Sequence, residues 1–148
     1  MSLPQILQFR LKIVKIKMIN YFTWREFDQS VEHIANKCEF LDFSGIYGVP
    51  RGGLCLAVAL SHKLKINLIS EPLKNSLIVD DVYETGTTLS NFKDIEGAMF
   101  FVLFSKVEPT WWNTVFKSEK SKWIVFPWEN RSNSENERLN YAYKRGLS

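Results

Sequence analysis

The sequence of 148 residues has few cysteines, no long apolar run and no secretory signal. Its two cysteines, Cys38 and Cys55, match no metal-ligand spacing and do not predict a disulfide framework. No apolar run approaches the roughly 18 residues that a membrane-spanning helix needs, and no signal segment with an apolar core is present. These absences argue against a disulfide-stapled secreted domain and against a membrane partner, so we expect a reducing, cytoplasmic location.

The excess of basic residues is confined to the first 17 residues. The chain has 19 Lys and Arg against 16 Asp and Glu, a net charge of +3. Four of those basic residues and no acidic residue lie in residues 1–17, so the remaining 15 basic and 16 acidic residues give residues 18–148 a net charge of −1. Such a nearly neutral body does not predict a nucleic-acid partner. We interpret residues 1–17 as a basic leader or extension (an edge strand, a surface helix or an extra upstream start) and residues 18–148 as a single domain.

Apolar periodicity predicts strands that alternate with helices. Thr23 and Glu26 have the spacing of a capping box, which predicts a helix over about 24–37. Further apolar patterns predict strands over 45–49, 66–69, 77–79 and 99–104 and helices over 54–64 and 88–94. This order predicts an α/β fold, a mainly parallel twisted sheet flanked by helices, with ligands bound at the carboxyl ends of the strands.

The last third of the chain is rich in aromatic residues. Four tryptophans fall within 18 residues, with two phenylalanines among them: Trp111, Trp112, Phe116, Trp123, Phe126 and Trp128. So much aromatic surface must pack on the sheet or on a flat ligand. We therefore predict a small aromatic-rich C-terminal hood, and for Trp111 and Trp112 we expect packing or an oligomer contact.

The most informative segment is residues 77–89, LIVDDVYETGTTL. Backbone N–H groups and hydroxyls of residues 85–88, with a following helix start, can hold one phosphate, and a glycine lets the backbone approach the anion. Asp80 and Asp81 cannot bind phosphate but suit sugar hydroxyls or a magnesium ion. The segment thus predicts a ribose 5-phosphate site, against the simpler alternative of a capped strand–turn–helix. The Gly-Lys-Ser/Thr ending of the nucleotide P-loop is absent.

This segment resembles the phosphoribosyl pyrophosphate motif of type I phosphoribosyltransferases. Residues 46–54, IYGVPRGGL, resemble the pyrophosphate loop of the family, and Lys106 follows a strand where the purine enzymes place a lysine. Residues 122–129, KWIVFPWE, resemble the Trp-Ile-x-x-Pro-Trp-Asp segment of the bacterial xanthine–guanine enzymes, the closest group in its motifs. The resemblance covers roughly residues 19–130, with the motifs in the same order.

The resemblance implies transfer of ribose 5-phosphate from phosphoribosyl pyrophosphate to a 6-keto purine (guanine, xanthine or hypoxanthine), with release of pyrophosphate and use of magnesium. It implies that Asp80 and Asp81 hold the ribose hydroxyls, directly or through magnesium, and that Glu84 is the catalytic carboxylate. The remaining implied positions are the 5-phosphate loop, the pyrophosphate site and the base site: Glu84, Thr85, Gly86, Thr87 and Thr88; Arg51, Gly52 and Gly53; Lys106, Trp123, Ile124 and Glu129. The family usually forms dimers or tetramers, so a homo-oligomer is expected.

Two departures from the family pattern keep other readings open. Only residues 70–75 separate Ile69 from Ser76, which leaves no room for the long flexible loop that closes over the site in most members. Glu129 stands where the resemblance expects Asp, so the choice of base is open.

Three of the implied site residues also have a purely structural alternative. Arg51 could be a solvated loop residue, Lys106 a surface lysine and Trp123 a core residue. The functional alternatives are a non-catalytic regulator that binds phosphoribosyl pyrophosphate or nucleotides, and a transferase for adenine or a pyrimidine.

Overall fold

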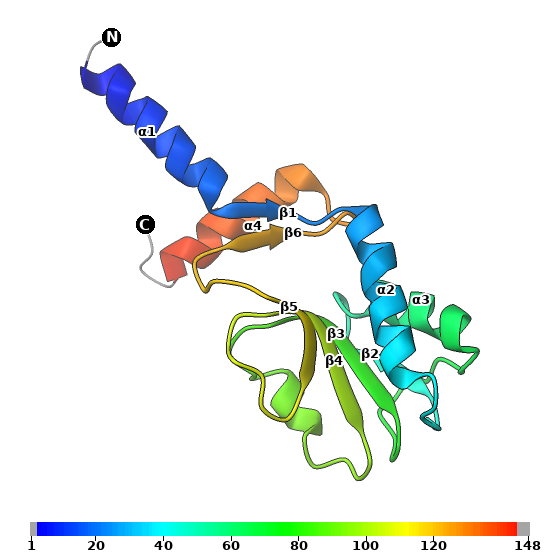
Figure 1. Cartoon of the computed structure of the whole chain (residues 1–148). Helices are drawn as coiled ribbons and strands as arrows, with labels where there is room; N and C mark the ends of the chain where they lie inside the picture. Colours follow the sequence, from blue (N-terminus) through cyan, green and yellow to red (C-terminus); the bar gives the residue numbers. More distant parts are fainter. Residues whose placement is uncertain (1–2, 145–148) are drawn as a thin grey trace. The chain divides into compact units, whose positions relative to one another are not determined.

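The computed structural model describes residues 3–144 and divides the chain into two compact units. We call Phe27–Lys120 the sheet unit, because it contains the main sheet. The terminal unit consists of Met1–Glu26 and Ser121–Ser148, and so includes both ends of the chain. Figure 1 labels the helices and strands of each unit.

The sheet unit is built on four parallel strands in the spatial order β2-β3-β4-β5. Their bounds are β2 (Ile46–Gly48), β3 (Leu77–Tyr83), β4 (Met99–Ser105) and β5 (Asn113–Lys117). Helix α3 (Leu54–Leu64) follows β2 and packs against β2 and β3, while the 3-10 helix η1 (Leu89–Phe92) connects β3 to β4 (Figure 1). This arrangement confirms the predicted α/β fold with a parallel sheet flanked by helices.

The predicted capping box starts helix α2 (Trp24–Cys38). The backbone N–H of Glu26 donates to Thr23 Oγ1 at 3.1 Å, and the backbone N–H of Thr23 donates to Glu26 Oε2 at 2.8 Å. These two bonds satisfy donors that an uncapped helix would leave free. The buried residues recur at helical spacing, so one face of α2 is apolar: Phe27, Val31, Ile34, Ala35 and Cys38.

Three of the expected elements differ from the structure. The strand expected over 66–69 is reduced to one isolated bridge between Leu68 and Ile46, because the segment lies at the open edge of the sheet and Leu68 is exposed. The strand expected over 77–79 continues to Tyr83, because Asp80–Tyr83 pairs with β4 despite its two acidic residues. The helix expected over 88–94 is only the four-residue η1, and β5 was not foreseen.

The core of the sheet unit contains the tryptophans that the sequence could not assign. Trp112 is buried and stacks on Tyr83, with ring centroids 3.7 Å apart and an angle of 10° between the rings. Trp111 meets the edge of the Phe100 ring at 5.1 Å and packs against the same cluster. Of the two roles considered for this pair of tryptophans, the structure therefore supports packing.

The terminal unit contains a second, two-stranded sheet. Strand β1 (Ile19–Tyr21) pairs in parallel with β6 (Trp123–Val125). Helix α1 (Leu3–Lys17) precedes β1, so the leader takes the helical form among those considered, and helix α4 (Arg131–Lys144) follows β6. Neither β1 nor β6 showed an apolar pattern that indicated a strand, and α4 is mostly polar, so none of the three was predicted.

Aromatic rings pack against one another after β1 and β6. Phe126 stacks on Trp128, with centroids 4.8 Å apart, and meets the edge of Phe22 at 5.7 Å. Trp24 lies 6.0 Å from Trp128. This cluster confirms the predicted aromatic-rich C-terminal element.

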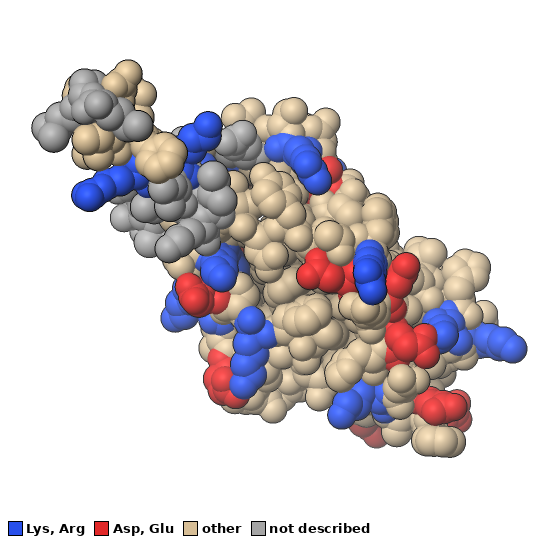
Figure 2. All heavy atoms as spheres, turned by 45° about the horizontal axis from the view of Figure 1, so that its top comes forward, with Lys and Arg blue, Asp and Glu red and all other residues tan. Residues whose placement is uncertain are grey.

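Charged side chains of both signs are interspersed on the face of the molecule drawn in Figure 2. Exposed ion pairs in the sheet unit join Lys63 to Glu32 and Lys74 to Glu96. On that face the described residues form no continuous basic stripe of the kind that follows a nucleic-acid backbone. Within residues 3–144, no helix combines the length and the apolar character needed to cross a bilayer.

Candidate active site

The predicted phosphate, ribose and pyrophosphate residues meet at one edge of the main sheet. Strands β2, β3 and β4 are parallel, so their carboxyl ends, and the loops that follow them, share this edge. The loop after β2 carries Arg51, the end of β3 carries Asp80 and Asp81, and Lys106 directly follows β4. The topology thus brings together segments that are far apart in the sequence.

Asp80 and Asp81 lie within β3, and not in a loop after it as expected. Asp80 Oδ1 accepts the backbone N–H of Asp81 at 2.8 Å, and Asp81 Oδ1 accepts that of Val82 at 2.7 Å. Burial, together with the adjacent Asp81 charge, raises the pKa of Asp80 to about 8, and burial also raises the pKa of Asp81. Without a cation, the pair therefore retains a proton at neutral pH.

The chemistry of the carboxylate pair is compatible with a magnesium ion. No Lys, Arg or His of the described residues forms an ion pair with Asp80 or Asp81, so the pair lacks a compensating cation. No group of three His, Cys, Asp or Glu in residues 3–144 is arranged to hold a metal. Magnesium is commonly bound by one or two carboxylates plus water and substrate phosphates, which is the donor set that this pair could complete.

The loop after β3 presents hydroxyls and a glycine in a backbone conformation that suits glycine. Gly86 has φ of +79°, and a Cβ at this position would collide with the Tyr83 hydroxyl. The hydroxyls of Thr85 and Thr87 lie 2.9 Å apart, and both residues are exposed together with Thr88. Because η1 has only four residues, anion binding here would depend on the N–H and hydroxyl groups of the loop, without the helix contribution that we expected.

The loop after β2 lies directly against the carboxylates. The α-carbon of Gly52 is so close to Asp81 that a Cβ would overlap the carboxylate. Gly53 is enclosed by backbone atoms, and its Cβ would meet the Val79 carbonyl and, at 2.8 Å, the Val49 nitrogen. Arg51 is exposed and is joined to Pro50 by a cis peptide bond. The two glycines therefore allow the loop after β2 to lie close to Asp81 and to the backbone of β3.

Substitutions at these two glycines should separate stability from activity. Gly53→Ala is expected to lower the free energy of unfolding by on the order of 2 kcal/mol, because rigid backbone surrounds the added methyl group. Gly52→Ala should cost less stability, since the Asp81 side chain can move aside, but it should lower transfer at least about tenfold by displacing that carboxylate. Urea unfolding and steady-state kinetics of both variants test this, and equal losses of stability would contradict it.

Lys106 and Glu84 form a partly buried ion pair. Lys106 Nζ lies 2.7 Å from Glu84 Oε1, and the lysine and glutamate side chains are 3% and 28% exposed. A lysine this buried is rare unless it is paired. The structure therefore excludes the alternative of Lys106 as a surface lysine, and it connects the predicted base-binding lysine with the predicted catalytic carboxylate.

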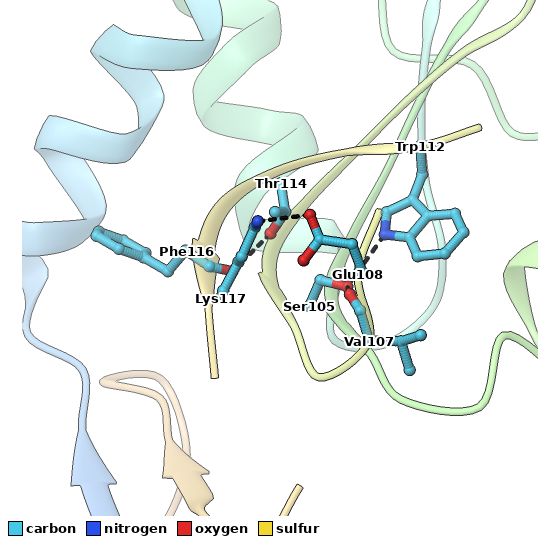
Figure 3. Close-up of polar contacts among 7 residues, drawn as sticks. All are labelled: Ser105, Val107, Glu108, Trp112, Thr114, Phe116 and Lys117. Atoms are coloured by element: carbon cyan, nitrogen blue, oxygen red, sulfur yellow. Dashed lines mark hydrogen bonds and ion pairs between the residues drawn. The ribbon is translucent and has the colours of Figure 1, made fainter. Parts of the chain in front are cut away.

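Hydrogen bonds and ring stacking next to Glu84 and Lys106 hold the ends of β3 and β4, which these two residues directly follow. Ser105 Oγ accepts a hydrogen bond from Trp112 Nε1 at 3.1 Å and donates to the Val107 carbonyl at 2.6 Å (Figure 3). The same Trp112 stacks on Tyr83, the residue before Glu84. Tyr83, Ser105 and Trp112 were not among the predicted site residues. Tyr83 and Ser105 adjoin Glu84 and Lys106 in the sequence, which was the available signal for these two, whereas Trp112 had no such signal.

The other predicted base-binding residues belong to the terminal unit. Trp123 is half-buried and Ile124 is buried in β6, so Trp123 retains a partly accessible surface. Glu129 follows β6, and its Oε2 accepts a hydrogen bond from Ser134 Oγ at 2.9 Å. The sheet unit by itself therefore contains the residues predicted to bind the phosphate, ribose and pyrophosphate, together with Lys106.

The raised pKa of Asp80 predicts that stability depends on pH. An unfolded aspartate loses its proton near pH 3.9, whereas Asp80 in the folded protein keeps its proton up to about pH 8. Between these values the folded state binds more protons, so the free energy of unfolding falls as pH rises. We expect a loss on the order of 2 kcal/mol between pH 5 and pH 8 in EDTA, and a smaller loss in Asp80→Asn. Urea unfolding at several pH values measures both, with Asp94→Asn as an exposed control.

Comparison with solved structures relates this fold to phosphoribosyltransferases. A purine phosphoribosyltransferase from Pyrococcus horikoshii is 31% identical, with a TM-score of 0.66 over 76% of this chain and 95% of that chain. The xanthine-guanine-hypoxanthine phosphoribosyltransferase of Helicobacter pylori is 17% identical, with a TM-score of 0.61 over 80% of this chain and 99% of that chain. A hypothetical protein from Neisseria gonorrhoeae with bound ppGpp is 18% identical, with a TM-score of 0.61 over 84% and 97%. The sequence matches no family model and no curated protein.

The fold is that of an α/β protein whose predicted site residues gather where its parallel strands end. Because the chain covers 95% of the Pyrococcus horikoshii enzyme at 31% identity, it belongs to the type I phosphoribosyltransferase family. It is an enzyme of phosphoribosyl transfer, with phosphoribosyl pyrophosphate and a base as substrates. The two weaker matches show the shared fold alone.

Proposed function

We propose that this phosphoribosyltransferase uses a 6-keto purine (guanine, xanthine or hypoxanthine) as its base. The observation that carries the proposal is the buried ammonium of Lys106, held 2.7 Å from Glu84 at the start of the phosphate loop. An ammonium has three donors and no acceptor, so it suits a keto oxygen better than an exocyclic amine. The name of the 31% identical relative, a purine phosphoribosyltransferase, also supports a purine.

In the proposed reaction the base replaces pyrophosphate at C1′ of the ribose. The C1′–O bond to pyrophosphate breaks as a purine nitrogen bonds to C1′, and the proton of that nitrogen passes to Glu84. Asp80 and Asp81 hold the ribose hydroxyls, residues 84–88 hold the 5-phosphate, and Arg51 with Gly52 and Gly53 holds the pyrophosphate. Magnesium bound at Asp80 and Asp81 would neutralise charge on the departing pyrophosphate.

Lys106 can donate a hydrogen bond to the base while it keeps its hydrogen bond to Glu84. Because its ammonium has three hydrogens, one can remain on Glu84 Oε1 while another donates to the 6-keto oxygen. This bridge would hold the carboxylate at a fixed distance from the reacting ring. Trp123 would stack on the base, and the Ile124 backbone and Glu129 would contact its 2-position edge.

A panel of bases tests the proposal. Pyrophosphate release from phosphoribosyl pyrophosphate would be measured with magnesium and each of six bases, with products identified by mass: guanine, xanthine, hypoxanthine, adenine, orotate and uracil. We expect nucleotide with the 6-keto purines only, and the preference to weaken in Lys106→Met. Exclusive use of adenine, or of a pyrimidine, would overturn the proposal and leave phosphoribosyl transfer itself intact.

A further inference from the structure

A cavity in the terminal unit shares Trp123 with the proposed base site, but its other lining residues have no role in the transfer reaction as proposed. It has a volume of about 190 Å³ and lies between one face of the β1–β6 sheet and helix α4, which runs alongside these strands in Figure 1. Residues from both strands and from α4 form its walls: Ile19, Tyr21, Trp123, Val125, Arg131, Ser132, Ser134 and Arg138. Its only charged lining residues are two arginines.

Arg138 is the unusual member of this lining. It is only 7% exposed, and its Nε and Nη2 atoms are buried with no hydrogen-bond partner among the described residues. A guanidinium remains charged at any physiological pH and has five N–H donors to satisfy. Burying such a group without a carboxylate or other acceptor is costly, so its position on the cavity wall indicates that an anion completes it.

The start of α4 brings a second guanidinium to the same cavity. The helix begins at Arg131, and the Asn130 side chain already accepts the backbone N–H of Ser132 at 3.0 Å. Arg131 extends over the Tyr21 ring, with its Cζ 5.1 Å from the ring centroid. Ser134 Oγ donates to Glu129 Oε2, which is not part of the cavity lining. A second guanidinium and the positive end of a helix dipole thus accompany Arg138.

We propose that this cavity is a second anion site, which binds a compact phosphate-type oxyanion between Arg138 and Arg131. Paired guanidinium groups suit the several oxygens of phosphate and pyrophosphate, which each can accept two parallel hydrogen bonds. The volume is below the roughly 300 Å³ at which pockets for larger ligands begin, so it suits the free ion better than a whole nucleotide. All of the lining residues belong to the terminal unit, whereas the residues of the phosphate loop belong to the sheet unit.

The arginine Nε–Hε signals in ¹⁵N NMR spectra of the full chain can test this site without interference from the phosphate loop. The Arg138 signal is assigned by its loss in Arg138→Gln, and the exposed Arg25, assigned through Arg25→Gln, serves as a matched control. We expect inorganic phosphate or pyrophosphate to shift the Arg138 signal with saturation at millimolar or lower concentration, while the Arg25 signal stays in place. The proposal would be overturned if neither ion shifted the Arg138 signal. It would also be overturned if the Arg138 and Arg25 signals both shifted linearly with ion concentration, without saturation.

Two further arms identify the ligand source and exclude a folding defect. If guanosine monophosphate shifted the Arg138 signal and neither free ion did, the proposal of a compact free anion would be wrong. The ligand would then be a phosphate group on a larger molecule. Because Arg138→Gln removes an uncompensated buried charge, we expect this variant to be at least as stable as the parent chain without anion. It should also lose part of the thermal stabilisation by phosphate that Arg25→Gln keeps. Equal stabilisation of both variants would contradict the site, whatever the outcome of the base panel.

Discussion

Replacing Asp80 and Asp81 together by Asn should lower phosphoribosyl transfer by about 10³-fold and raise the thermal stability of the metal-free protein at pH 8. The activity falls because two charge-assisted contacts to the ribose or its magnesium are lost, each worth roughly 1.5–3 kcal/mol. The stability rises because the two carboxylates are adjacent, Asp80 buried and Asp81 half-buried, and burial raises the pKa of both, that of Asp80 to about 8, so ionising both is costly in the folded state. Asn has nearly the same shape, so packing in β3 is retained.

Kinetics with phosphoribosyl pyrophosphate and thermal unfolding in EDTA measure the two effects. The double variant Asp42→Asn/Asp94→Asn removes the same charge from exposed positions of the sheet unit and should change neither quantity appreciably. If the active-site variant kept parental turnover, the assignment of the ribose site would be wrong. If its stability at pH 8 fell, the carboxylates would have stabilising partners that the structure does not contain.

The second large effect is expected for Glu84→Gln, which should lower kcat by about 10²-fold. A positioned carboxylate that accepts a proton in the transition state typically contributes 10²–10⁴-fold, and Gln cannot accept that proton. Gln keeps an oxygen that can accept the hydrogen bond from Lys106 Nζ, so the lysine should stay near its position. Binding of phosphoribosyl pyrophosphate should therefore weaken less than turnover falls.

Pre-steady-state binding and steady-state turnover separate these two quantities. Glu96→Gln is a suitable control, because Glu96 is also paired with a lysine but both side chains are more than 70% exposed. A double-variant cycle with Lys106→Met measures how strongly the two groups depend on each other. Unchanged turnover in Glu84→Gln would exclude the catalytic role, and fully additive effects in the cycle would show that the ion pair is not used in catalysis.

The shortened connection before β3 has a direct consequence for the enzyme. Residues 70–76 link the Leu68 bridge to β3 through turns alone, so within this unit no long loop lies between them. A closing loop excludes water from a site and completes it. Without one here, we expect slower transfer than in enzymes that have the loop, and the base panel measures that rate.

The amino-acid sequence determined those elements whose signal is local. The capping box at Thr23 and Glu26, the apolar stripe of α2 and the continuous apolar run of β4 follow from helix and strand periodicity. The resemblance of residues 46–54 and 77–89 to the family motifs gave the fold class, and the 31% identical relative confirms it. Short motifs of this kind can be recognised because each acts through its own backbone and side chains.

Tertiary structure alone decided which residues meet. Pairing with β4 makes Asp80 and Asp81 part of a strand, although two adjacent acids in the sequence indicate a loop. The ion pair between Glu84 and Lys106, 22 positions apart, exists only because β3 and β4 are parallel neighbours and end at the same edge. Likewise, the three-residue strands β1 and β6 have no pattern of their own. They form because segments more than 100 residues apart can satisfy each other's backbone hydrogen bonds.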